Sequence, residues 1–239
     1  MADETSTLVT AARQRMSAQW VPNRFIDLLE RGEVPKGHLR ALAGELYRVV
    51  GSDLRSFSLL ASRFPAAPAG DLFLTMAQGE AQALRLLLDF ASALGMDEAL
   101  LMAYEPRPLA QAYPAYLAST ALYGSRSDVA LALLANAAES GDEYTRVGDA
   151  LCQRYGLDER AVGHFRFLAD TPQELLDQAT RTLRTGLAEG DDDVQAVRTA
   201  WTVHALELLY WRVLAEGIEG GRVATTRRAW ERDDDDDDR

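Results

Sequence analysis

Apolar residues recur along nearly the whole chain at steps of three and four positions, which is the spacing of an α-helix. This periodicity predicts helices over residues 7–19, 24–30, 35–63, 71–96, 98–104, 109–123, 128–155, 159–185 and 194–216. No stretch alternates between apolar and polar residues for long enough to form a strand, and no motif repeats at a fixed period. The pattern therefore predicts an all-α domain rather than a helical solenoid.

Proline and glycine mark the ends of several predicted helices. Pro65 ends the helix over 35–63, and Gly156 follows the last residue of a later helix. Pro172 lies inside the predicted helix 159–185. Because proline has no amide hydrogen for the helical ladder, we expect Pro172 to kink this helix or to start it again.

The predicted helix over 71–96 contains a carboxylate where its pattern requires an apolar side chain. Glu80 lies in the apolar stripe, one turn after Met76 and one turn before Leu84. An ionised carboxylate without a partner is costly in an apolar interior, so Glu80 must find a partner, stay neutral or line a cavity. The alternative is that the helix is rotated and Glu80 faces solvent.

Composition limits the classes of function that the chain can have. Its 239 residues, 47% of them hydrophobic, are enough for one full core. The net charge is −12, and half of it belongs to the aspartates at 233–238, so no basic stripe is present for nucleic-acid binding. The single cysteine, Cys152, excludes an internal disulfide and a cysteine-rich metal site.

The sequence also predicts where the protein works. No apolar run approaches the roughly 20 residues of a membrane span, and the N-terminal segment lacks the basic and apolar regions of a signal peptide. We therefore expect a cytoplasmic protein that binds neither membranes nor nucleic acids. Residues 1–218 are expected to form one helical domain, and residues 219–239, which lack apolar periodicity, a disordered acidic tail.

Local motifs at both ends of the helical region are shared with a known family. VPNRF at 21–25 precedes LLERGEVP at 28–35, and near the other end Glu207, Tyr210 and Trp211 form a Glu-x-x-aromatic-Trp pattern. Over roughly residues 20–216 this order of motifs resembles the TenA and PqqC proteins of the haem-oxygenase-like superfamily. The resemblance implies a bundle of about seven helices around a central small-molecule cavity, often in a homodimer.

The resemblance implies a chemistry only where the residues that carry it are present. Thiaminase-type relatives use a nucleophilic cysteine on their fifth helix. The corresponding stretch, 133–139, has no cysteine, and Cys152 lies about four turns further along. Thiamine hydrolysis by that route is therefore not expected, although Glu45 corresponds to the pocket aspartate of these relatives and Glu207 to their pocket glutamate.

Iron-dependent relatives, the haem-oxygenase-like diiron oxidases, need a mixed set of carboxylate and imidazole ligands. Glu80 and Glu139 match the two carboxylates outside the sixth helix, but Ala83 stands where the first histidine is required. The ligand positions of the sixth helix fall on Leu168, Pro172 and Leu175. The resemblance therefore implies a chain without the usual diiron ligands, and we assign no metal ligand and no cofactor.

The chain contains three histidines, His38, His164 and His204, and none has the spacing of a metal site. Each is expected to be structural, although His204 lies one turn before Glu207 and a pair between them is the alternative.

Polar groups on several predicted core faces define the candidate site. Aromatic rings beside carboxylates suit a flat, polar or cationic ligand. The candidate acid or base residues are Glu80, Glu139 and Glu207. The candidate ligand-contacting residues are Glu45, Tyr47, Asn136, Tyr144, His204, Tyr210 and Trp211. The alternatives are that Tyr210 and Trp211 are ordinary core aromatics and that Glu139 lies on a solvated face.

Three functions remain open at this point. The first is a small-molecule enzyme of cofactor or secondary-metabolite metabolism, with acid–base or cofactor-less oxidative chemistry. The second is a non-catalytic relative that binds a ligand or pairs with an active partner. The third is an iron-dependent oxidase with a divergent site, which requires a different alignment of the sixth helix.

Overall fold

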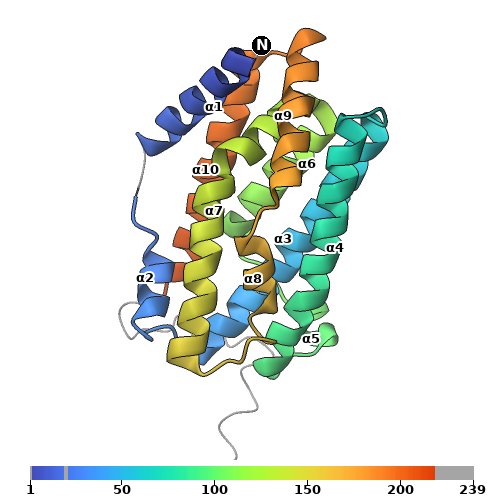
Figure 1. Ribbon diagram of the computed structural model, residues 1–239. Helices are drawn as coiled ribbons and strands as arrows, with labels where there is room; N and C mark the ends of the chain where they lie inside the picture. The colour runs from blue at the N-terminus through green and yellow to red at the C-terminus, as the bar shows by residue number, and fades with distance from the viewer. Residues whose placement is uncertain (1, 19–20, 219–239) are drawn as a thin grey trace, which may run out of the picture.

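A computed structural model describes residues 2–18 and 21–218, which form ten α-helices and one 3-10 helix and contain no β-strand (Figure 1). In chain order the elements are α1 (Ala2–Ser17), α2 (Arg24–Glu30), α3 (Lys36–Arg63), α4 (Ala69–Ala93), α5 (Glu98–Ala103), η1 (Pro108–Gln111), α6 (Ala112–Tyr123), α7 (Arg126–Tyr155), α8 (Gly163–Ala169), α9 (Gln173–Ala188) and α10 (Asp193–Ala215). The predicted all-α class is confirmed, and the predicted tail at 219–239 lies outside the described residues.

The long helices run along a common axis and form an elongated bundle (Figure 1). The helix α3 packs along α4, and α7 packs against both α9 and α10. The short helix α8 lies between α7 and α4 and contacts both. The N-terminal helix α1 covers α10 and α7. No helix in the described part of the chain combines the length and the apolar character that a membrane span requires.

Side-chain caps set the ends of several helices. Ser125 caps α7 in a capping box with Asp128, so α7 begins at Arg126, two residues earlier than the sequence pattern predicts. At the other end, Gly156 adopts φ 68°, a left-handed conformation that glycine reaches without steric cost. The side chain of Asp192 accepts a hydrogen bond from the amide of Gln195 at the start of α10.

The interior contains two apolar clusters. The first, here called the Phe165 core, includes Leu46, Phe90, Phe165 and Trp211, with Tyr144 packed against it. The second, here called the Phe73 core, consists of buried apolar residues at the opposite end of the long helices. Its members include Phe57, Phe73, Leu117, Val129, Leu183 and Val203. Because α3, α4, α7 and α10 contribute to both, the two cores lie in one bundle.

Several predicted boundaries differ from the structure for identifiable reasons. The predicted helix 159–185 is divided into α8 and α9, and Pro172 precedes the first residue of α9, as its missing amide hydrogen led us to expect. The region before Gly163 is a turn, because the Asp158 carboxylate accepts a hydrogen bond from the amide of Ala161. The bundle also has more helices than the seven expected, since short helices such as α5 and α8 fall between the long ones.

Candidate functional site

A cavity of about 720 Å³ is lined by residues of both cores. The helices α3, α4, α6, α7 and α10 contribute to its wall, together with α8, α9 and the connection between them. This volume lies in the range of pockets that bind small organic molecules.

Among the carboxyl groups that line this cavity, three come from three different helices, and we call them the acidic belt: Asp53 from α3, Glu80 from α4 and Glu207 from α10. The Tyr113 hydroxyl donates a hydrogen bond of 3.1 Å to Oδ2 of Asp53, whereas Oδ1 of Asp53 is buried without a hydrogen-bond partner. Glu80 and Glu207 are only partly covered, because part of each side chain borders the cavity. The belt therefore presents carboxyl oxygens to the cavity that the described residues do not neutralise.

The surroundings raise the pKa of all three carboxyl groups. Burial raises the pKa of Asp53 to about 7, against the opposing effect of the Tyr113 hydrogen bond. Burial, with the charges of Glu143, Asp53 and Glu139, raises the pKa of Glu207 to about 8. Burial and the nearby Asp53 charge hold the pKa of Glu80 well above its ordinary value. At neutral pH the belt therefore shares protons, and it can both donate and accept them.

Three tyrosines, Tyr113, Tyr144 and Tyr210, also line the cavity. Burial, reinforced by the nearby carboxylates, raises the pKa of Tyr113, Tyr144 and Tyr210, so all three remain neutral phenols and hydrogen-bond donors. The hydroxyl of Tyr210 is buried and has no hydrogen-bond partner. A polar ligand in the cavity could therefore receive hydrogen bonds from phenols while it faces the carboxyl groups.

A fourth carboxylate, Glu143, lies at the Phe165 end of the cavity. The Asn23 amide donates a 2.7 Å hydrogen bond to it, and a hydrogen bond from Trp211 also lowers its pKa, although burial raises the pKa overall. Trp211 in turn stacks on Phe25, with ring centroids 5.8 Å apart. These contacts hold the end wall of the cavity in place.

The structure brings together six of the ten residues that the sequence predicts for the site. The six residues that line the cavity are Glu80, Asn136, Tyr144, Glu207, Tyr210 and Trp211. The four that do not line it are Glu45, Tyr47, Glu139 and His204. The predicted set is therefore divided between the cavity and other parts of the bundle.

Glu45 and Tyr47 lie on α3 but contact the segment that follows α4. Glu45 is fully buried, and its carboxylate accepts hydrogen bonds from the Tyr104 hydroxyl at 2.9 Å and the Arg107 amide at 2.8 Å. The Tyr47 hydroxyl reaches Glu98 at 3.5 Å near the surface. Glu45 therefore fixes the connection between α5 and η1, and it does not take the place at the cavity that the resemblance implies.

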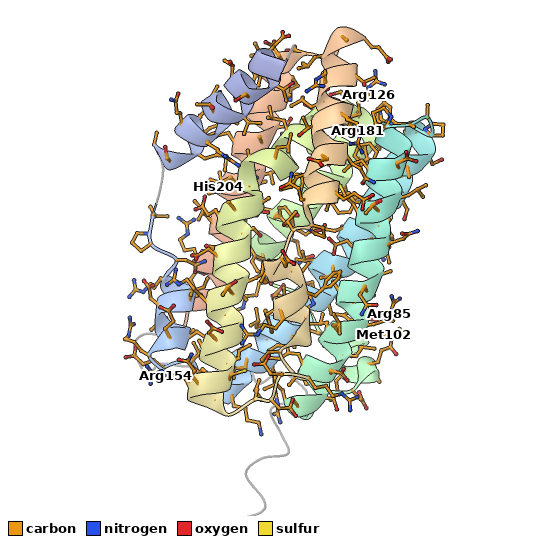
Figure 2. The ribbon with its side chains drawn as sticks, viewed as in Figure 1. Arg85, Met102, Arg126, Arg154, Arg181 and His204 are labelled. Atoms are coloured by element: carbon orange, nitrogen blue, oxygen red, sulfur yellow. The ribbon has the colours of Figure 1, made fainter. Side chains whose placement is uncertain are left out.

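His204 and Glu139 face each other outside the cavity. Nδ1 of His204 lies 3.8 Å from Oε2 of Glu139, whose side chain is 39% exposed. Figure 2 shows His204 beside α7, on the side of the bundle that carries α1. His204 therefore pairs with Glu139 and not with Glu207. Glu139 lies on a solvated face, which was one of the two positions that the sequence allowed for it.

The cavity residues that sequence reasoning missed include Asp53, Tyr113 and Glu143. Asp53 carried a detectable signal, because it lies one turn from Val49 and one turn from Phe57 on the buried face of α3. Glu143 is seven residues after Asn136, so these two residues share a face of α7. The same criterion that selected Glu80 would have selected Asp53.

The residues at the cavity do not fit the mixed diiron ligand set. Within the described residues, no group of three or more His, Cys, Asp or Glu side chains could hold a metal ion. Nδ1 of His164 bonds the Ala83 carbonyl at 2.9 Å, and burial lowers the imidazole pKa to about 4. The positions that the resemblance assigns to ligands of the sixth helix do line the cavity, but with the apolar side chains of Leu168, Pro172 and Leu175.

The nucleophile of the thiaminase-type relatives is also missing from the cavity wall. Cys152 lies near the end of α7, with Sγ 3.7 Å from Oε1 of Glu159, and is not among the lining residues. Burial and the Glu159 charge raise the pKa of this thiol, which disfavours the reactive thiolate. Among the described residues, the cavity wall therefore carries carboxyl, phenol, amide and hydroxyl groups and the guanidinium of Arg166, but no thiol.

Solved structures show that this helical bundle has the haem-oxygenase-like fold. A domain of unknown function with a heme oxygenase-like fold from Shewanella denitrificans OS217 gives a TM-score of 0.64 at 16% identity, covering 89% of this chain and 88% of that one. A TenA family transcription regulator from Silicibacter sp. TM1040 gives 0.62 at 18% identity, covering 88% and 96%. A TenA homologue from P. horikoshii OT3 gives 0.61 at 16% identity, covering 89% and 97%.

The family follows from the sequence itself. The model of the TENA/THI-4/PQQC family matches residues 16–184, so the chain belongs to this family. None of the curated proteins gives a significant sequence match. The matched region includes Asp53 and Glu80 of the acidic belt, and Glu207 lies beyond it.

Proposed function

We propose that this chain is an enzyme that performs acid–base chemistry on a small molecule bound in the cavity. The observation that carries the proposal is the convergence of Asp53, Glu80 and Glu207 from three helices on one cavity. Membership in the TENA/THI-4/PQQC family supports a small-molecule role. The site chemistry favours proton transfer, because carboxyl groups and phenols are among the groups that face the cavity.

The acidic belt supplies an acid and a base at the same pH. Glu207, with its pKa raised to about 8, is mostly protonated at neutral pH and serves as the general acid. Asp53, with its pKa raised to about 7, is protonated in about half of the molecules and serves as the base when ionised. The hydrogen bond from Tyr113 orients the Asp53 carboxylate toward the cavity. Groups with separated pKa values are the usual basis of such a division of roles.

The test measures conversion of a defined panel of polar and cationic metabolites by mass spectrometry. We expect the wild-type protein to convert at least one compound, and Glu207→Gln or Asp53→Asn to reduce the rate about 100-fold or more. Glu33→Gln is the matched control, because this side chain is 52% exposed and pairs with Arg31 on the surface. Its rate should stay within about twofold of the wild type.

Two outcomes would decide against this proposal. If a compound binds in the cavity and raises the unfolding temperature but is never converted, the chain is a ligand-binding relative without turnover. If Glu207→Gln and Asp53→Asn convert the compound at the wild-type rate, the acid–base role of the belt is wrong, whatever the reaction is.

A further inference from the structure

The cavity is long, and its ionisable groups on α7 and α10 lie toward one end of it. Its lining on α7 extends from Val129 to Tyr144, which is about 22 Å at 1.5 Å per residue. On α10 the lining extends from Thr199 to Trp211, which is about 18 Å. The ionisable groups of these two helices that line the cavity all lie toward one end, since the first is Glu143 on α7 and Glu207 on α10. A large part of the cavity therefore extends beyond the acidic belt.

That part belongs to the Phe73 core, and we call it the apolar compartment. It is lined by Phe57, Met76, Leu117, Val129, Leu133 and Val203, all of which pack in or against the Phe73 core. From Glu207 to Thr199 the compartment covers about 12 Å of α10. Its wall has the character of a site for hydrocarbon rather than for a second charge.

Most polar atoms of the apolar compartment are already satisfied by the protein. The hydroxyls of Thr75 and Thr120 donate to main-chain carbonyls of their own helices, and that of Thr199 donates to Asp128. The side-chain oxygens of Asn136 and Gln178 are buried without partners. These two amide oxygens are uncharged acceptors, so they can receive an N–H or O–H group but give no site for an anion.

The acidic belt, in contrast, has no cationic partner within residues 2–18 and 21–218. Arg166 is the one basic side chain among the described residues that line the cavity. Its guanidinium is already paired with Asp149 at 2.6 Å and with Glu159 at 3.1 Å. Oδ1 of Asp53 is buried with no hydrogen-bond donor. A cation that enters the cavity would therefore be attracted to three carboxyl groups that it does not share with any arginine or lysine.

We propose that the ligand of this cavity is an amphipathic amine, with its ammonium group among Asp53, Glu80 and Glu207 and its hydrocarbon part in the apolar compartment. The inference rests on the small-molecule function proposed above and specifies the ligand class of that site. The Phe165 end of the cavity is a poorer place for the hydrocarbon, because Glu143, Tyr144 and Tyr210 bring polar groups into its wall.

Titration calorimetry with simple amines tests the ligand class. We expect octylamine to bind at least tenfold more tightly than butylamine, because the longer chain fills the apolar compartment. Octanoate, with nearly the same chain and the opposite charge, should not bind measurably. 1,8-Diaminooctane should bind more weakly than octylamine, because its second ammonium group would face the apolar wall.

Variants separate the two parts of the proposed site. Asp53→Asn and Glu207→Gln should each lower the affinity for octylamine and for butylamine at least tenfold, while Glu33→Gln leaves both affinities unchanged. Ala132 is a small residue in the wall of the apolar compartment. Ala132→Leu should therefore reduce the higher affinity of octylamine over butylamine, and Ala132→Phe should reduce it further, while the affinity for butylamine stays the same. The use of two sizes keeps the test valid if the larger side chain disturbs the fold.

The binding reaction should also release protons. An ammonium group favours the ionised form of the belt, so octylamine binding near pH 7 should displace protons and tighten as pH rises from about 6 to 8. The ionisable groups that border this space on the surrounding helices are Asp53, Glu80, Tyr113, Glu143, Tyr144, Arg166, Asp170, Glu174, Glu207 and Tyr210. The binding enthalpy, measured in buffers of different ionisation enthalpy, gives the number of protons released per amine bound. This number should be smaller for Glu207→Gln than for the wild type.

The possible results overturn either the ligand class alone or the whole proposal. Equal affinity for butylamine and octylamine, binding of octanoate, or no amine binding at all would overturn the amphipathic-amine inference. If the metabolite panel still yields a converted compound, the proposed function stands without it. If no compound of the panel and no amine binds or reacts in a way that depends on the belt residues, the proposed function and the amphipathic-amine inference are both wrong.

Discussion

Glu45 and Asp53 lie two turns apart on the buried side of α3, yet their carboxyl groups have opposite surroundings. Glu45 accepts hydrogen bonds from Tyr104, Arg107 and Gln111, at 2.9, 2.8 and 3.2 Å, so its charge is stabilised by the protein. Asp53 receives one hydrogen bond, from Tyr113, and its other oxygen has no partner. Burial without enough donors therefore makes Asp53 a group with a raised pKa, available to a ligand.

The first prediction concerns the pH dependence of stability. Glu207 has a pKa of about 8 in the folded protein and an ordinary value of 4.5. Between these values the folded state holds a proton that the unfolded state has lost, so the free energy of unfolding falls as pH rises from about 4.5 to 8. Glu207→Gln lacks this titration, so its free energy of unfolding should exceed that of the wild type by up to about 5 kcal/mol at pH 9, while the two are similar at pH 4.

Urea unfolding at the two pH values measures this difference. Glu33→Gln, a change of the same chemistry on the surface, should follow the wild-type pH dependence. A wild-type free energy of unfolding that rises from pH 5 to pH 9, or a Glu207→Gln variant with the same slope as the wild type, would contradict the pKa shift derived from burial.

At the residue scale the sequence reveals burial better than function. Helical phase placed Glu80 and Glu207 inside the bundle, and it could have found Asp53 by the same criterion. It also selected Glu45, because the periodicity of one helix does not tell whether a buried carboxylate meets donors from a distant loop or an open cavity. That distinction depends on Arg107 and Gln111, which lie more than 60 residues further along the chain.

At the scale of elements, two glycines on cavity-facing helices have opposite surroundings. A Cβ atom added at Gly141 of α7 would lie 2.7 Å from the carbonyl oxygen of Ala169, at the end of α8. A Cβ added at Gly79 of α4 would meet nothing within 4 Å. The close approach at Gly141 holds the connection between α8 and α9 against α7, and this connection forms part of the cavity wall.

We therefore expect opposite effects from the same substitution. Gly141→Ala should lower the free energy of unfolding by about 1–3 kcal/mol, because main chain has to move. Gly79→Ala should raise it by up to about 1 kcal/mol, since alanine favours helix and the added methyl group enters open space. Chemical denaturation of both variants measures the contrast, and equal destabilisation by the two changes would show that the contact between Gly141 and Ala169 is unimportant.

The elements were the most predictable level of the structure. Apolar periodicity located the long helices, and Pro172 marked the division between α8 and α9. The start of α8 could not be predicted in the same way, because it depends on a turn stabilised by Asp158 rather than on periodicity. The way α8 fits between α4 and α7 is a tertiary contact and leaves no local pattern in the sequence.

At the scale of the molecule, two apolar cores share the same long helices, and the acidic belt belongs to neither core. Continuous helices transmit any loss of packing at one end to the other. Phe73→Ala and Phe165→Ala, each removing a fully buried ring from a different core, should therefore each lower stability by about 3–5 kcal/mol. Both variants should unfold in a single transition.

Far-UV circular dichroism and amide hydrogen exchange check this expectation. In the Phe73→Ala variant, amides next to Phe165 should exchange at the same raised rate as those next to residue 73. Protection that is retained around Phe165 while it is lost around residue 73 would show that the two cores are independent folding units.

The unneutralised belt also bears on how long the protein survives in a cell. An empty cavity at mildly alkaline pH carries carboxylates that oppose folding, and a cation that binds only the folded protein stabilises it by an amount that grows with the logarithm of the cation concentration above its Kd. Proteases act on transiently opened chains, so their action tracks the fraction that is open. Molecules without ligand should consequently be degraded first, and the abundance of this protein should rise and fall with the supply of the compound that fills it.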